Sequence, residues 1–110
     1  MGYYLLQWCY KDTQYKAMVE KPQDREKAVS KAVESFGGKL HEFFFAFGDY
    51  DGVAILEFAD NESATAFLLT IGSGGAVSKL KTTVLLSPGE AKKAMKKAHE
   101  TKSGYAPPSG

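Results

Sequence analysis

Three side chains in this sequence combine proton-transfer chemistry with an apolar neighbourhood. His41 precedes the aromatic run 43–45, Glu57 lies near the end of the apolar run 53–58, and Lys81 belongs to an alternating segment. Imidazole, carboxylate and ammonium groups can each donate or accept a proton, and an apolar pocket suits proton abstraction next to a carbonyl. We therefore take His41, Glu57 and Lys81 as candidate catalytic acids or bases.

Two of these candidates also have an ordinary structural explanation. His41 fits a histidine at the rim of a sheet, and Glu57 fits a strand-end glutamate in water. A buried glutamate would instead need a polar partner. The candidate partners are Lys79, Lys81 and Gln7, and Glu57 could itself act on the His41 imidazole. Both explanations stay open for each residue.

A second group of side chains would surround a bound molecule. Cys9 has no neighbouring base in the sequence, so a structural thiol competes with a nucleophile at this position. Tyr50 and Asp51 belong to the turn 48–52, where turn chemistry explains most residues and a position at a pocket mouth is the functional alternative. The expected ligand-binding residues are Gln7, Cys9, Phe43, Phe45, Tyr50, Asp51 and Lys79.

Composition and charge exclude several classes of function. The 110 residues fit one domain, and 14 basic against 13 acidic residues give a net charge of +1. This charge is too small for a surface that binds nucleic acid or anionic membrane. No apolar run approaches the roughly 20 residues of a membrane span. A single cysteine suits a cytoplasmic protein, and two histidines without ligand spacing predict no metal and no cofactor.

Hydrophobic periodicity predicts four strands and three helices in the order βαββαβ plus a C-terminal helix. The predicted strands are residues 3–10, 40–47, 53–58 and 76–86. The predicted helices begin at Pro22, at Asp60 and at Ser87 as N-cap, and residues 15–20 are ambiguous between helix and loop. This order is that of an α+β, ferredoxin-like antiparallel sheet with both core helices on one face. Residues 1–88 would form the domain, 89–102 the C-terminal helix and 103–110 a flexible tail.

The predicted strands are apolar on both faces, although the two core helices can cover only one. Leu6 and Trp8 suit the helix side. The other face would then carry Gln7, Cys9, His41, Phe43, Phe45, Glu57, Lys79 and Lys81. Because so large an apolar face is unusual on a monomer, we expect a homodimer or larger homo-oligomer with these faces packed together. The alternative is that the C-terminal helix folds back over this face, but its apolar stripe is thin.

The turn Gly48-Asp49-Tyr50-Asp51, preceded by Gly37-Gly38-Lys39-Leu40, resembles that of the GYD-domain family. The helix from Asn61 and the strand from Ala76 are also similar to that family, so the resemblance spans residues 3–88. It implies a dimeric α+β barrel, in which two ferredoxin-like sheets pack into a barrel. That superfamily includes cofactor-free monooxygenases, cyclases, isomerases and haem enzymes, and the GYD family itself implies no particular activity.

These observations predict a small protein that binds an apolar or aromatic organic molecule in a dimeric barrel. One alternative is a cofactor-free enzyme of isomerase, cyclase or monooxygenase type. The other is a non-catalytic assembly or scaffold subunit whose sheet face is filled by its partner. A pocket that contains His41 or Glu57 favours the enzyme, whereas a solid interface favours the assembly subunit.

Overall fold

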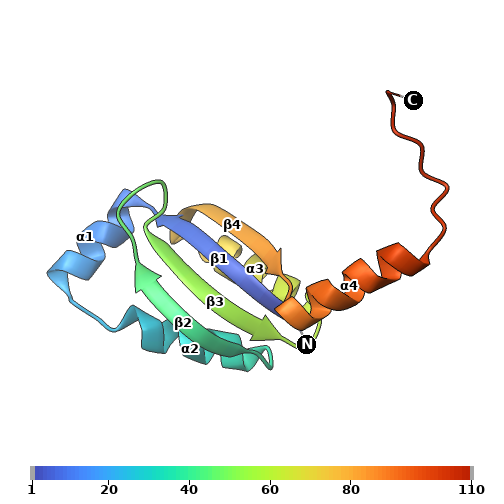
Figure 1. Ribbon diagram of the computed structural model, residues 1–110. Coiled ribbons are helices and arrows are strands. Elements are labelled where there is room, and N and C mark those ends of the chain that lie inside the picture. Colours follow the sequence, from blue (N-terminus) through green and yellow to red (C-terminus); the bar gives the residue numbers. More distant parts are fainter. Residues whose placement is uncertain (1, 110) are drawn as a thin grey trace.

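The computed structural model describes residues 2–109 as one four-stranded antiparallel sheet with two of its four helices packed on one face (Figure 1). The strands are β1 (Gly2–Tyr10), β2 (Lys39–Phe45), β3 (Gly52–Phe58) and β4 (Val77–Leu85). The helices are α1 (Asp12–Glu20), α2 (Arg25–Ser35), α3 (Asn61–Ser73) and α4 (Pro88–Glu100). The sheet order is β2-β3-β1-β4, which is the predicted ferredoxin-like arrangement.

The core forms where the even-numbered residues of β1 and β3 meet α2 and α3. Leu6, Leu56 and Phe58 are buried from the sheet, and Val33 and Phe67 are buried from the two helices. Phe58 and Phe67 pack with their ring centroids 5.5 Å apart. Alternation along the strands therefore sends one set of side chains to the core and leaves the other set on the opposite face.

Side-chain caps define where the core helices begin. Asp24 accepts a hydrogen bond from the Lys27 amide at the start of α2, and Asp60 accepts one from the Ser63 amide at the start of α3. The prediction that the first core helix starts at Pro22 was wrong, because the chain stays extended until the Asp24 cap. The ambiguous segment near Tyr15 is helical, within α1.

Gly52 allows the β2–β3 hairpin to lie against β1. It pairs with Trp8 in the sheet, and a Cβ atom at this position would overlap the Trp8 ring. Because a ring held in the core cannot move aside easily, only glycine fits here. Glycine is therefore required at the end of this turn by its packing against Trp8 as well as by turn geometry.

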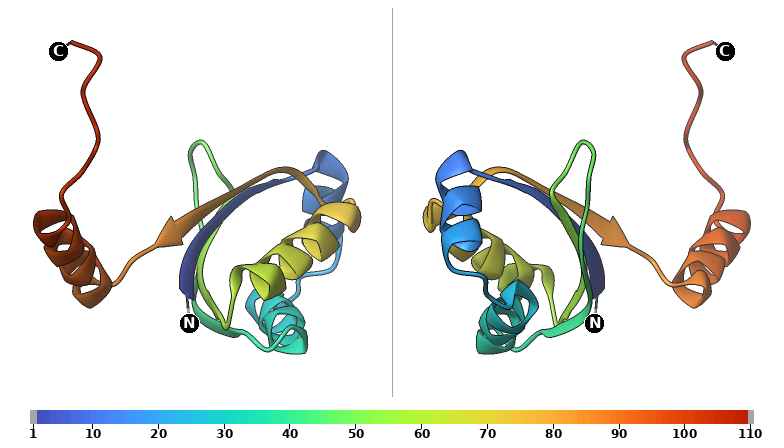
Figure 2. Two further views of the ribbon diagram at one scale, coloured as in Figure 1. Left: turned by 90° about the vertical axis from the view of Figure 1, so that its right-hand side faces the viewer. Right: turned by 90° about the vertical axis from the view of Figure 1, so that its left-hand side faces the viewer.

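Helix α4 projects away from the sheet, on the side opposite α2 and α3 (Figure 2). Ser87 and Glu90 form a capping box at its start, as the sequence predicts, and none of its residues is buried. The radius of gyration is 17.9 Å, against about 13 Å for a compact domain of this length. The alternative in which this helix folds back over the sheet is wrong for the single chain. No helix within residues 2–109 is long and apolar enough to cross a membrane.

Candidate functional site

The open face is the side of the sheet turned away from α2 and α3 (Figure 2). It carries the odd-numbered residues of β1, of β3 and of positions 79–85 in β4, because the registers pair odd residues with odd residues across the three strands. Five candidate residues share this face, which confirms their predicted placement: Gln7, Cys9, Glu57, Lys79 and Lys81. Their functional roles stay predictions.

Apolar side chains occupy much of the open face. Leu5 lies between Ile55 and Thr83, and Tyr3 lies between Glu57 and Leu85. Tyr3, Leu5, Val53, Ile55 and Leu85 are each half-buried. On the neighbouring edge strand Phe44 lies opposite Val53 and is 58% exposed. The single chain therefore leaves a continuous apolar strip without a cover.

His41 and Glu57 form an ordered pair at one end of this strip. The His41 Nε2 atom lies 2.8 Å from Glu57 Oε1, and only 13% of the Glu57 side chain is exposed. The Tyr3 ring lies beside the imidazole, with the ring centroids 5.4 Å apart. When Nε2 carries the proton, it donates a hydrogen bond to Glu57 and Nδ1 remains available as a base.

Three candidate partners of Glu57 were wrong, because Lys79, Lys81 and Gln7 lie elsewhere on the face. Glu57 pairs with Tyr3 in the sheet, whereas Lys81 pairs with Gln7. Four residues of strand separate these positions, which corresponds to roughly 13 Å. Lys81 therefore does not join His41 and Glu57 in one cluster.

A β-bulge in β2 explains a second correction. The register shifts between Leu40 and Glu42, so His41 is the extra residue and the side chains after it change face. Phe43 and Phe45 were expected beside His41 on the open face, but they lie on the helix side. Phe43 pairs with Ala54 and packs on Trp8, with ring centroids 5.3 Å apart.

Asp51 anchors the hairpin turn to the end of β1. Its carboxylate accepts a hydrogen bond from the Tyr10 amide at 2.9 Å, and its own amide donates to the Trp8 carbonyl at 2.8 Å. A hydrogen bond from Tyr15 to Asp51 raises the pKa of that tyrosine to about 12, with burial as a smaller cause. These contacts favour the structural explanation of Asp51.

Tyr50 and Cys9 lie near the opposite end of the face from the His41–Glu57 pair. The Lys79 ammonium lies 4.9 Å from the centroid of the Tyr50 ring. The Cys9 thiol donates to the Asp49 carbonyl, with 3.3 Å between sulfur and oxygen. This contact favours a structural thiol, since a carbonyl cannot accept the thiol proton as a base would. Within residues 2–109 no three His, Cys, Asp or Glu side chains are arranged to hold a metal ion.

The sequence matches the family model of the GYD domain over residues 4–95, which is most of the chain. The chain belongs to the GYD-domain family. No curated protein is similar enough in sequence to match it. The family assignment agrees with the resemblance seen in the turn at residues 48–51.

Solved structures support the fold of this GYD domain. The chain is similar to FFRP-DM1, with a TM-score of 0.57 and 13% identity over 78% of this chain and 100% of that one. It is also similar to TTHA0845 from Thermus thermophilus (TM-score 0.53, 18% identity, 79% and 95% covered). A third similar structure is the transcriptional regulator NMB0573 from Neisseria meningitidis in complex with L-Met (TM-score 0.53, 16% identity, 79% and 51% covered). Identities this low establish the ferredoxin-like α+β fold alone.

Proposed function

We propose that this GYD domain is a homodimer whose two open faces pack together and enclose a site for a small apolar or aromatic organic molecule. The observation that carries this proposal is the uncovered apolar strip around Leu5 and Ile55, with the His41–Glu57 pair at its end. An apolar strip is stabilised when a second copy covers it, and a two-fold arrangement uses the same surface on both chains. The pair then supplies the polar contact that orients a bound molecule.

Helix α4 completes the proposed interface. Four strands about 4.8 Å apart, with about eight residues each at 3.3 Å, give the open face roughly 500 Å². A standard interface buries roughly 800 Å² on each partner, so the sheet alone is too small. Helix α4 lies on the open-face side of the sheet (Figure 2), and Met95 in it is 69% exposed. Packed against the partner, α4 would supply the missing area.

Sedimentation velocity tests the dimer. We expect the natural chain to sediment as a dimer at micromolar concentration, and Ile55→Lys to sediment as a monomer because a charge would be buried between the sheets. Ala28→Lys is the matched control, since Ala28 is exposed on α2 away from the open face. A chain ending at residue 86 should also dimerise more weakly. A natural chain that stays monomeric at high micromolar concentration would contradict the proposal.

Proton-transfer catalysis without a cofactor is the second candidate function. It is favoured by one observation, the 2.8 Å contact that orients the His41 ring on Glu57. In this role His41 Nδ1 removes a proton next to a carbonyl and Glu57 stabilises the resulting imidazolium. The test is hydrogen–deuterium exchange at carbon in small aromatic ketones, followed by NMR. His41→Gln should abolish the exchange and Glu57→Gln should slow it. Unchanged exchange in both variants would remove the pair from the mechanism.

A further inference from the structure

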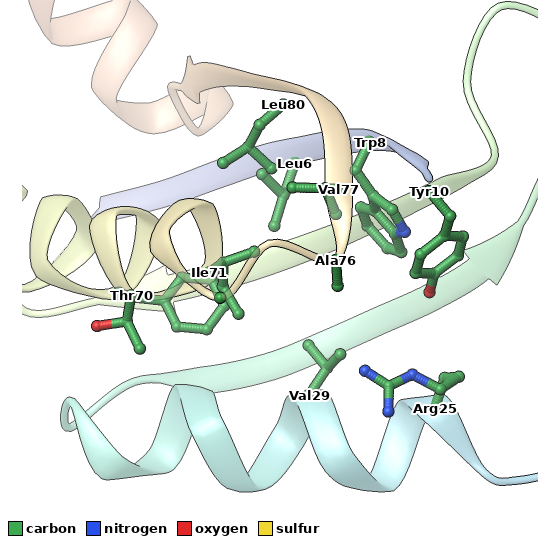
Figure 3. A pocket seen from close by; sticks show the side chains of 12 residues that line it. Leu6, Trp8, Tyr10, Arg25, Val29, Thr70, Ile71, Ala76, Val77 and Leu80 are labelled. Carbon is green, nitrogen blue, oxygen red and sulfur yellow. The ribbon is translucent and has the colours of Figure 1, made fainter. Parts of the chain in front are cut away.

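An apolar pocket lies on the other side of the sheet, between β1, the start of β4 and the helices α2 and α3 (Figure 3). Its volume is about 170 Å³. Most of its lining is aliphatic or aromatic. The side chains that set its shape and charge are Leu6, Trp8, Tyr10, Arg25, Val29 and Ile71. The pocket therefore opens within the core layer rather than on the open face.

The volume matches one aromatic ring or a short branched alkyl group. An apolar cavity of about 150 Å³ in another protein stays dry and binds benzene. Filling the pocket with an apolar group would bring new contacts to Trp8 and Ile71 and would remove that group from water. The pocket thus selects the size and the apolar character of its occupant.

Arg25 gives the pocket its one positive charge. It is the only arginine among the 14 basic residues of the chain, and Figure 3 shows it rising from the start of α2 beside Tyr10. Its guanidinium donates one hydrogen bond, to Gln23 Oε1 at 3.0 Å. Among residues 2–109 no carboxylate lies within 4.0 Å of this guanidinium. The remaining donors of the group are free for an anion.

A smaller hollow adjoins the pocket at Arg25. The two share Tyr10, Arg25 and Ala76, and the smaller hollow, about 50 Å³, is also lined by the amide side chains of Gln14 and Gln23. A ligand whose apolar end fills the large pocket would therefore place its polar end beside Arg25 and Gln14, since the Gln23 amide already bonds to Arg25 and to the Lys21 carbonyl. Guanidinium and amide groups are suited to bind a carboxylate, the former with two parallel hydrogen bonds.

We infer that this pocket binds a small aromatic or branched aliphatic carboxylate, with the apolar group against Trp8 and the carboxylate on Arg25. In the described part of the chain no aspartate or glutamate lines either hollow, so the ammonium group of an amino acid would lose water without gaining a charged partner. A simple carboxylate is therefore preferred over an amino acid. This site lies on the opposite side of the sheet from the proposed dimer interface and does not depend on it.

Tryptophan fluorescence tests the inference directly, because Trp8 is the only tryptophan and it lines the pocket. Titration of the full chain with phenylacetate should give a saturable change in Trp8 emission. Phenylacetamide has the same shape without the charge and should bind at least tenfold more weakly, as expected from the loss of a charge-assisted hydrogen bond. L-phenylalanine should also bind more weakly than phenylacetate.

Two variants test the contacts and two serve as controls. Arg25→Gln should weaken phenylacetate binding at least tenfold, whereas Lys27→Gln, on the exposed side of the same helix, should leave it unchanged. Val29→Phe should fill the pocket and abolish binding. If this variant does not fold, Arg25→Gln alone tests whether the ligand binds in the pocket, because Arg25 is not in the core and its replacement should not prevent folding. Ile55→Lys should leave binding intact, which separates this inference from the dimer.

Two results would overturn the inference. One is equal affinity for phenylacetate and phenylacetamide, which would mean that the charge of Arg25 contributes nothing to binding the carboxylate. The other is the absence of any saturable emission change with phenylacetate, 3-phenylpropionate or 3-methylbutanoate at millimolar concentration.

Discussion

His41 and Glu57 come from strands that are adjacent in the sheet, and their side chains meet at 2.8 Å beside a β-bulge in which His41 is the extra residue. Without the bulge, regular alternation starting from Leu40, which packs against the core, would direct the next side chain to the open face and the following one back to the core. The bulge keeps both His41 and Glu42 on the open face. The bulge therefore adds Glu42 to this face and turns Phe43 to the core, while His41 stays beside Glu57.

The His41–Glu57 pair should contribute modestly to stability. Glu57→Gln is expected to lower the free energy of unfolding by about 1 kcal/mol, since the pair is only partly buried. Glu100→Gln is the control, because the Lys96–Glu100 pair spans 3.9 Å between largely exposed side chains and should contribute close to nothing. Urea denaturation measures both values. An equal loss of unfolding free energy in the two variants would contradict the larger contribution expected of the His41–Glu57 pair.

Gly52 is expected to be irreplaceable because of its contact with Trp8. Gly52→Ala should cost about 1–3 kcal/mol of unfolding free energy, since the added methyl group would overlap the ring. Gly72→Ala provides the comparison, because nothing lies within 4 Å of a Cβ there and Gly72 is inside α3. That change should be neutral or stabilising by up to about 1 kcal/mol. Thermal unfolding of both variants decides the matter, and a stable Gly52→Ala protein would show that the hairpin can move.

Phe67 should be the most sensitive position of α3. It is fully buried against Phe58, and Phe67→Ala should lower the unfolding free energy by about 3–5 kcal/mol through lost burial and a cavity. Leu69, two residues further on, is 68% exposed, and Leu69→Ala should change stability by less than about 0.5 kcal/mol. Chemical denaturation of the pair of variants tests the assignment of the core face. A larger loss at Leu69 would mean that α3 packs with another face.

The Tyr15 hydroxyl should lose its proton at a higher pH than an ordinary tyrosine does. Its pKa is raised from 10.0 to about 12, chiefly by the hydrogen bond to Asp51, so the neutral hydroxyl is the form that the fold stabilises. The stabilisation is fully present below pH 10 and is lost as the pH rises from 10 to about 12. NMR titration of the tyrosine ring should give a lower pKa for Tyr15 in Asp51→Asn. An unchanged value would remove Asp51 as the cause.

Sequence reasoning predicted most of the sheet because alternation in three strands is regular. Leu6 and Trp8 point to the core while Gln7 and Glu57 point away, as the pattern indicates. It failed in β2, where the bulge breaks the alternation and three consecutive phenylalanines, at 43–45, give no indication of register. The start of the first core helix was predicted wrongly at Pro22, because proline is compatible with both the first turn of a helix and an extended linker.

The site was harder to predict than the sheet. His41 and Glu57 were expected on the same face, but their contact at 2.8 Å depends on the register of two strands, which a single sequence does not specify. The pocket beside Trp8 depends on how α2 and α3 spread over the sheet, and no motif marks such a gap. One signal was available: Arg25 is the only arginine in a chain otherwise supplied with lysine, and a lone guanidinium often serves a bidentate contact.

The projecting helix α4 has a consequence for how the chain would behave in solution. An isolated helix of 13 residues is only marginally stable in water, and the rest of the chain buries none of α4. In the single chain its amide hydrogens should therefore exchange with solvent quickly even when the amides of the sheet are fully protected. Slow exchange along α4 would then report that another molecule has docked onto it.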